Sequence, residues 1–303
     1  MFSDAQTSDA QTSDAQTSAA QISAAQISEK LSEHLRSLPA PRDPFLNAGK
    51  HTLAQHYLRT ELARWGQVTS QKFTARGSDY YNWQIEIPGT ARSLSPILIG
   101  AHYDTFPGSP GADDNASGLV TLLLLAELLH RKPPRRSVHF VAFDLEEYGL
   151  DGSIACAKAW KAQQRPLHLM ISLEMLGYFT AQPNSQRYPL QALSRLYPNA
   201  GDFIALIGNA ATIPRMRRMK AALKRSNAAC EWLPVINRGK QIPAVRRSDH
   251  APFWDEGYSA ILITDTAELR NPHYHTSADT IETLNIEKMS AITKGLFDYL
   301  KHA

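Results

Sequence analysis

Short apolar runs alternate along the chain with longer segments of helical spacing. The runs at residues 97–101, 137–143, 169–173 and 259–264 are apolar at nearly every position. This pattern is typical of strands that are buried on both faces of a parallel sheet. Residues 117–131 are apolar on nearly every side of a helix, which indicates a helix packed against such a sheet. The alternation therefore predicts an α/β fold with a largely parallel sheet covered by helices on both sides.

The periodicity of the remaining sequence extends this prediction toward both ends of the domain. Prolines between Ala40 and Pro44 interrupt a helical pattern, because proline breaks a helix and restricts the residue before it. The additional elements predicted from spacing are helices at 29–38, 47–65, 152–163 and 286–301, and strands at 67–74 and 80–87.

The N-terminus is a repeat of five residues. Over residues 3–27 the segment SDAQT occurs three times and is followed by SAAQI twice. Small and polar residues dominate this stretch, so it offers little apolar surface to offset the entropy lost on ordering. We therefore predict a disordered low-complexity tail over residues 1–28 and a single folded domain over residues 29–303.

Composition excludes several classes of protein. With 303 residues, 43% of them hydrophobic, the chain is long enough to bury a large core. Its two cysteines, Cys156 and Cys230, exclude a disulfide scaffold. They are interpreted as two buried free thiols, and a single disulfide between them is the alternative. No secretory signal and no run of membrane-spanning length is present, so the sequence predicts a cytoplasmic protein without a membrane partner.

Charge adds little to this picture. The formal net charge is +3 and the isoelectric point is about 8.8, which favours no particular class of partner. The six basic side chains of residues 214–225 are interpreted as the solvated face of a helix, and nucleic acid is not expected as a partner. The sequence does not predict the oligomeric state.

The four apolar runs lead to polar side chains that bind metals in other proteins. The first run is followed at once by His102, the second within a few residues by the acid pair Glu146 and Glu147, the third by Glu174, and the fourth by Asp265. In open α/β sheets, sites form outside the carboxyl ends of the strands. Ligands that are far apart in sequence are thus expected to converge at one edge of the sheet.

Two further segments, GADDNAS and NPHYHT, complete the set of candidate ligands. The first offers Asp113 or Asp114 in a glycine-flanked loop, and the second offers His273 or His275. Spacing alone leaves both choices open. Carboxylates and imidazoles without cysteine suit zinc or another divalent ion of the first transition row. An aspartate at such a turn can also bridge two ions through its two oxygens.

Two pairs of neighbouring residues suggest how the ligands are supported and used. His102 and Asp104 are two residues apart at a strand end and share a face, so Asp104 can orient the imidazole. Glu146 and Glu147 point in different directions, so that one can bind a metal while the other faces a reacting water. An acid left over beside a metal set suggests hydrolysis.

Six motifs, in the order HYD, GADDNASG, EEYGLDGS, EMLGY, SDHAPF and PHYHTSADT, resemble the M28 family of zinc peptidases, which includes bacterial aminopeptidases. The resemblance extends from about Glu29 to the C-terminus. It implies a single α/β domain of the zinc-exopeptidase (phosphorylase/hydrolase-like) type, in which a mixed, mostly parallel sheet lies between helices.

The resemblance also implies a metal-binding set. In this family two zinc ions share a bridging aspartate, which falls on Asp114. One ion is further held by residues that match His102 and Glu174, and the other by residues that match Glu147 and His275. Spacing left the choices between Asp113 and Asp114 and between His273 and His275 open. The resemblance selects Asp114 and His275.

The remaining roles follow from the same resemblance. Glu146 matches the general base. Asp104, together with Asp249 and His250 of the SDHAPF motif, is expected to support the ligands or to line the substrate pocket. The implied activity is that of a di-zinc aminopeptidase in which a metal-bridging water attacks the N-terminal peptide bond of a peptide. Two alternatives are a single-zinc acyltransferase similar to glutaminyl-peptide cyclotransferases and a carboxypeptidase of the same superfamily.

Side-chain preference cannot be read from the motifs. The segment from 178 to 248, which carries no motif, is expected to build the pocket. Four aromatic residues either line this pocket or belong to the core: Trp232, Phe253, Trp254 and Tyr258.

Overall fold

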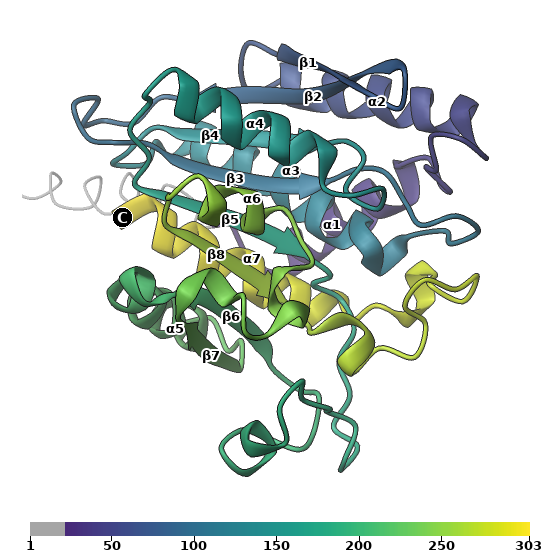
Figure 1. Ribbon diagram of the computed structural model, residues 1–303, viewed down its shortest axis with the longest axis vertical. Helices are drawn as coiled ribbons and strands as arrows, with labels where there is room; N and C mark the ends of the chain where they lie inside the picture. The colour runs from purple at the N-terminus through teal and green to yellow at the C-terminus, as the bar shows by residue number, and fades with distance from the viewer. Residues whose placement is uncertain (1–21) are drawn as a thin grey trace, which may run out of the picture.

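An eight-stranded mixed sheet runs through the structure, a computed structural model in which residues 22–303 are described (Figure 1). The strand order is β1-β2-β4-β3-β5-β8-β6-β7. The strands are β1 (Thr69–Ala75), β2 (Ser78–Ile87), β3 (Ile97–His102), β4 (Val138–Phe143), β5 (Leu169–Glu174), β6 (Ile204–Asn209), β7 (Cys230–Val235) and β8 (Ala260–Thr264). The four central strands β4, β3, β5 and β8 are parallel, whereas β2 and β6 pair with them antiparallel. The predicted mixed, mostly parallel sheet is confirmed.

Helices cover both faces of this sheet. The helices are α1 (Ala24–Ser37), α2 (Ala48–Ala63), α3 (Gly118–Arg131), α4 (Asp151–Ala162), α5 (Ile213–Arg225), α6 (His250–Asp255) and α7 (Ile286–His302). Buried residues of α1, α2, α3, α5 and α7 form one core cluster with the sheet, and those of α4 and α6 form another on the opposite face. In Figure 1, α4 and α6 accordingly lie in front of the strands and α7 lies behind them.

The double covering explains why the central strands are apolar at nearly every position. In β3, Ile97 and Ile99 belong to the larger core cluster and Leu98 to the smaller one. All six residues of β3 and of β5 are buried. Burying apolar surface contributes about 25 cal/mol per Å², so these strands are fixed in the centre of the sheet by both layers of helices.

The N-terminal boundary of the domain lies earlier than the sequence predicts. Helix α1 begins at Ala24, and Ser23 and Gln26 form a capping box at its start. Ile27 is fully buried together with Leu31 and Leu35. The predicted boundary near residue 29 is therefore wrong, because the isoleucine of the last repeat continues the apolar stripe of the helix. The rest of the predicted tail, residues 1–21, lies outside the described residues.

The segment from 178 to 248 holds strands β6 and β7, which periodicity did not predict. Strands β6 and β7 extend the sheet beyond β8, and β6 runs antiparallel to it. Helix α5 between them confirms the helix predicted over the basic segment. Cys156 and Cys230 are free and buried in different core clusters, as expected for thiols. None of the described helices combines the length and apolarity needed to cross a membrane.

Candidate metal centre

The parallel strands bring the candidate ligands to one edge of the sheet. His102 is the last residue of β3 and Glu174 is the last residue of β5, and both are buried. Glu146 and Glu147 follow β4 in the adjoining turn. Since β3, β4 and β5 are parallel, their carboxyl ends meet at this edge. The convergence predicted from the apolar runs is therefore confirmed.

Asp114 lies between the two histidines of the site. Its Oδ1 is 3.2 Å from Nε2 of His102, and its Oδ2 is 3.2 Å from Nε2 of His275. Glu174 Oε1 lies 3.4 Å from Nε2 of His102, and Glu147 Oε2 lies 3.1 Å from Nε2 of His275. One carboxylate thus joins two groups of ligand-type atoms, one on each of its oxygens.

Each group has the composition of a metal site. The atoms offered by His102, Asp114 and Glu174 lie within 4.8 Å of one another, as do those offered by Asp114, Glu147 and His275. Nitrogen and carboxylate oxygen donors suit zinc. Within the described chain, Glu147 Oε1 is buried without a hydrogen-bond partner. A buried carboxylate oxygen without a partner is costly, so these residues fit a bound cation.

The protonation of the site reflects its crowded carboxylates. Burial raises the pKa of Glu147 to about 8, and the charge of Asp114 adds to this effect. Burial opposes protonation of His102, but the charges of Glu174 and Glu146 outweigh it and raise the pKa of the imidazole. Burial alone would raise the pKa of Asp114, but its contacts with His102 and His275 outweigh this effect and lower the pKa. The protein therefore needs positive charge among these groups, which divalent cations supply.

Glu146 lies beside the two groups, and its carboxylate, with atoms of His102 and Glu147, forms a third set of ligand-type atoms within 4.8 Å of one another. Its Oε2 lies 3.9 Å from Nε2 of His102, whereas the neighbouring Glu147 faces His275. The two neighbours thus point in different directions, as the sequence predicts. Burial raises the pKa of Glu146 well above its usual range, although the charge of His102 counteracts it. A carboxyl in this position can take up a proton from a bound water and release it again.

Two buried aspartates hold the backbone of the acidic loops. Asp104 accepts the N–H of Glu146 on Oδ1 and the N–H of Glu147 on Oδ2, both at 3.1 Å. Its Oδ1 also lies 3.4 Å from Nδ1 of His102, so the predicted contact with the imidazole is present. The backbone carbonyl of Asp104 is the nearer partner of that nitrogen, at 3.2 Å.

Asp279 accepts two backbone N–H groups of the GADDNAS loop, as Asp104 accepts those of Glu146 and Glu147. It accepts the N–H of Asp113 at 2.8 Å and the N–H of Asp114 at 3.1 Å. Burial raises the pKa of Asp279 to about 7. Sequence reasoning missed this residue, although it stands in the last motif, PHYHTSADT. Only the structure brings its carboxylate beneath the GADDNAS loop.

The structure separates the two pairs of alternatives that spacing left open. Asp113 turns away from the histidines and accepts hydrogen bonds from the N–H of Gly177 and from Asn271 Nδ2, both at 2.8 Å. His273 lies edge-on to Tyr178, with ring centroids 5.8 Å apart. Asp114 and His275 are the members of each pair that enter the site.

Stacked aromatic rings fix the second histidine. The ring of His275 lies parallel to that of Phe106 at a centroid distance of 3.9 Å, and also to that of Tyr274 at 3.7 Å. His275 has a positive φ of 58°. Stacking on these rings restricts the imidazole to one plane, from which its Nε2 reaches Asp114 and Glu147.

The SDHAPF motif contributes to the site through a residue that sequence reasoning did not single out. Ser248 donates a hydrogen bond to Glu174 Oε2 at 2.8 Å. Asp249 is fully buried, and burial raises its pKa to about 7. His250 is a core residue: its ring packs edge-on against Trp254, and its Nε2 donates to the carbonyl of Val245 at 2.9 Å. Neither Asp249 nor His250 lines the pocket described next, contrary to one of the two roles predicted for them.

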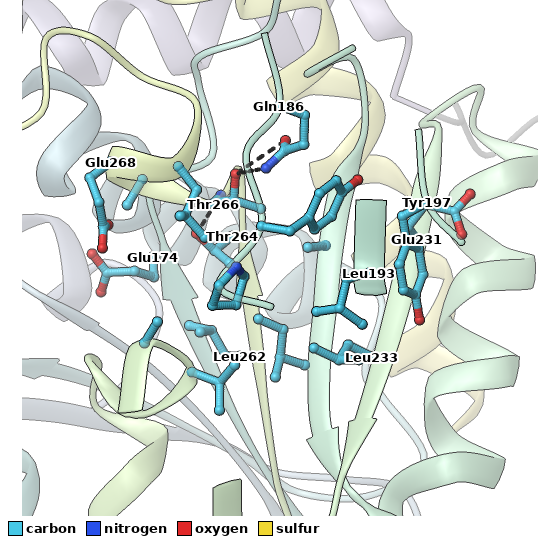
Figure 2. Close-up of a pocket in the computed structure, with 18 of the residues that line it drawn as sticks. Glu174, Gln186, Leu193, Tyr197, Glu231, Leu233, Leu262, Thr264, Thr266 and Glu268 are labelled. Carbon is cyan, nitrogen blue, oxygen red and sulfur yellow. Dashed lines mark hydrogen bonds between the residues drawn. The ribbon is translucent and has the colours of Figure 1, made fainter. Parts of the chain in front are cut away.

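An apolar pocket opens beside Glu174 (Figure 2). Leu193, Leu233 and Leu262 line its middle, and Figure 2 shows Tyr197 and Glu231 at the side away from Glu174. Its walls come from the segment 186–197, from β6, β7 and β8, and from residues 244–247 and 264–274. The motif-free segment therefore does build much of the pocket. Among the four aromatic candidates, Trp232 lines it, whereas Phe253 and Trp254 are buried core residues and Tyr258 packs against their cluster.

Comparisons with known proteins agree with this architecture. The model of peptidase family M28 matches residues 82–300. YfbL of Escherichia coli is 37% identical over 90% of this chain and 86% of its own length. Aminopeptidase YwaD of Bacillus subtilis is 27% identical over 72% of this chain. A probable aminopeptidase of Saccharomyces cerevisiae is 25% identical over 75% of it. The chain spans 44% and 58% of these two aminopeptidases, about half of their length.

Solved structures share the fold at lower identity. The LapA aminopeptidase of Legionella pneumophila superposes with a TM-score of 0.67 at 19% identity, over 92% of this chain and 71% of that one. A glutaminyl cyclase of Bacteroides thetaiotaomicron superposes with a TM-score of 0.66 at 17% identity, over 94% and 99% of the two chains. Proteins named aminopeptidase and glutaminyl cyclase thus share this fold, so the activity of this chain has to be inferred from its site.

Proposed function

The chain belongs to peptidase family M28, and on this basis we propose that it is an aminopeptidase that uses two zinc ions to hydrolyse the N-terminal bond of peptides. The observation that carries the proposal is the position of Asp114. Its two oxygens face His102 and His275 at the same distance of 3.2 Å. A carboxylate so placed can bridge two cations. His102 and Glu174 would hold one of them, and Glu147 and His275 the other.

The chemistry of the proposed reaction divides between the ions and the protein. Zinc would polarise the scissile carbonyl and lower the pKa of a bound water to about 7. Glu146 would take the proton of this water on its carboxylate and pass it to the leaving amine. Burial and the raised pKa of Glu146 suit both transfers. Asp104 holds the Glu146 backbone in place for them.

The pocket beside Glu174 suggests where the first side chain of the peptide binds. Its middle is lined by leucines, and its far carboxylate, Glu231, is paired with Lys220 at 2.9 Å. A substrate side chain therefore meets mainly apolar surface, which favours large apolar residues. The name leucine aminopeptidase that several relatives carry is consistent with this preference.

The glutaminyl cyclase alternative is less well supported by the ligand set. A single-zinc enzyme needs one group of three ligands, whereas this site offers a second one formed by His102, Asp114 and Glu174. Each of the three members of that second group is buried. Burial of a histidine and two carboxylates without a function is costly. The second group therefore supports hydrolysis by two ions.

A comparison of two substrates tests the proposal. Metal-free protein would be supplied with zinc and assayed on a leucyl amide and on a glutaminyl peptide. Release of the amine from the leucyl compound without cyclisation of the glutaminyl peptide supports the aminopeptidase. Cyclisation without hydrolysis would replace it with the acyltransferase. Release of C-terminal residues from a peptide with a blocked N-terminus would instead indicate a carboxypeptidase.

A further inference from the structure

Basic side chains from three segments meet at the edge of the sheet opposite the metal centre. Arg136 Nη1 donates a hydrogen bond to the carbonyl of Ser95 at 2.9 Å. The backbone N–H of His168 donates to the next carbonyl, that of Pro96, at 2.8 Å. Arg215 Nε in turn donates to Nε2 of His168 at 3.3 Å. Two arginines and a histidine therefore lie around the start of β3.

The antiparallel strand β6 explains how the basic helix reaches this edge. Because β6 runs opposite to β8, it ends where the parallel strands begin, and only three residues separate it from the start of α5 (Figure 1). The first turns of α5 carry Arg215 and Arg218. The C-terminus of the chain lies at the same edge, since Arg135 donates its backbone N–H to the carbonyl of Lys301. The N-terminal end of a helix adds positive potential here.

In the part of the chain that the structure describes, no side-chain carboxylate pairs with this charge. Within residues 22–303, none of Arg135, Arg136, Arg215 and Arg218, here called the arginine cluster, forms an ion pair with an acid. Lys220, one turn further along α5, does pair with Glu231. Arg136 Nε is buried without a hydrogen-bond partner in the described chain.

Burial and the charges of the arginine cluster lower the pKa values of His168 and of Arg136. Burial lowers the pKa of His168 to about 4, and the charges of Arg136, Arg215 and Arg218 lower it further. Burial likewise lowers the pKa of Arg136, with Arg135 and Arg215 contributing. Like charges held this close repel, and a bound anion removes that cost. His168 is neutral and accepts from Arg215 on Nε2, so its Nδ1 is left as a hydrogen-bond donor.

We propose that the arginine cluster is a binding site for a phosphate group, separate from the metal centre. Guanidinium groups present paired donors that match the oxygens of phosphate, and several of them balance its double charge. The phosphate can belong to a small molecule or to a lipid headgroup. The proposal does not depend on the peptidase reaction, because its residues lie at the opposite edge of the sheet.

Pyrophosphate is the probe for the first test. Calorimetric titration of the full-length protein is expected to give saturable binding that weakens with added salt. Arg136→Gln and Arg215→Gln should each weaken it about tenfold or more. Arg225→Gln, which removes the same charge from the exposed far end of α5, should change it less than twofold. Arg218→Gln, whose side chain is exposed, provides a cluster variant with no packing to lose.

A second readout is specific to the cluster. A phosphate beside His168 should raise the pKa of its imidazole, which NMR titration of that histidine can follow with and without pyrophosphate. A general increase in negative charge elsewhere on the protein would leave this pKa unchanged. An unchanged pKa at saturating pyrophosphate would contradict the proposed site.

Vesicles distinguish the two sources of phosphate. Sedimentation with phosphatidylglycerol vesicles, but not with phosphatidylcholine vesicles, would assign the site to a lipid headgroup if Arg136→Gln and Arg215→Gln abolish it. Binding of pyrophosphate alone would assign it to a soluble phosphate compound. Absence of both, or equal losses in Arg225→Gln, would overturn the proposal. Peptide hydrolysis should be unchanged in every one of these variants.

Discussion

The side chain of Asp104 holds the backbone of Glu147, since Asp104 Oδ2 accepts the Glu147 N–H at 3.1 Å. Its other oxygen does the same for Glu146. One buried carboxylate therefore fixes both the proposed general base and a proposed ligand. Asp279 accepts the backbone N–H groups of Asp113 and Asp114 in the same manner. Each acidic loop of the site thus has its own aspartate, and neither aspartate needs to touch the metal to affect it.

Substitution of Asp104 is expected to weaken the site without unfolding it. In Asp104→Asn one acceptor becomes an NH2 group, which cannot accept the N–H of Glu146 or Glu147. Metal affinity and kcat should each fall by about 10- to 100-fold, as is usual for residues that support metal ligands. Metal content after dialysis and steady-state kinetics would measure both. Asp298→Asn on α7 is the control, and an Asp104→Asn enzyme equal to it would refute the supporting role.

Removal of the proposed base should separate catalysis from binding. Glu146→Gln keeps the size of the side chain but cannot take a proton, so turnover of a leucyl amide should fall by about 10²-fold or more. Zinc content should stay at the wild-type value, because Glu147 supplies the ligand. Metal analysis alongside the assay checks both expectations. Near-normal turnover in Glu146→Gln would rule out the proposed mechanism.

The two histidines should each account for one ion. A chelator is expected to abolish activity and zinc to restore it, with two equivalents bound at saturation. His102→Ala and His275→Ala should each reduce the content to about one equivalent and lose most activity, since each ion loses its only imidazole. His273→Ala, which removes the neighbouring histidine, is the matched control. Active wild-type protein with a single equivalent of zinc would argue against a bridging role for Asp114.

Filling the pocket should change side-chain preference. Ala205 lines the pocket from β6 and is nearly buried. Ala205→Phe should lower kcat/KM for a leucyl amide by about tenfold or more, because steric loss in an apolar pocket costs roughly 1–3 kcal/mol. The alanyl amide, which needs less room, should change little. Ala221→Phe on the exposed side of α5 is the control. Equal losses of kcat/KM for both substrates would show that the substrate side chain does not bind in this pocket.

Acid should destabilise the fold through buried neutral histidines. Burial lowers the pKa of His250 to about 3, below the ordinary value near 6.5 that the unfolded chain regains. The unfolded state therefore binds a proton that the folded state rejects as pH falls from about 6.5 toward 3. The free energy of unfolding should decrease over this window by up to about 1.4 kcal/mol per pH unit from this residue.

Urea unfolding of metal-free protein between pH 7 and 4 would measure the effect. His250→Gln should show a shallower decline than wild type, since it has no imidazole to titrate. The exposed His302→Gln should retain the wild-type slope. Parallel curves for His250→Gln and wild type would show that another group causes the loss of stability.

The central architecture was predictable because burial on both faces leaves a clear mark in the sequence. Strands β3, β4, β5 and β8 had to be apolar at nearly every position, and the polar residues at or just after their ends stand out for that reason. The start of α1 was misplaced because the repeat hides Ile27, whose partners Leu31 and Leu35 lie outside it. Strand β7 was missed because most of it is only partly buried and Glu231 and Pro234 interrupt it. The apolar run of β6 is too short for periodicity to distinguish it from a buried helix segment.

For the site, the sequence by itself determined which chemical groups were available and, through strand ends, that they would gather at one edge. Motif resemblance then selected Asp114 over Asp113 and His275 over His273. Tertiary structure alone decided that the oxygens of Asp114 face different histidines, that Asp104 and Asp279 each bind two consecutive amides, and that His250 belongs to the core. The reason is physical: strand pattern reports burial, whereas the direction of a side chain in a loop depends on hydrogen bonds to residues far away in the sequence.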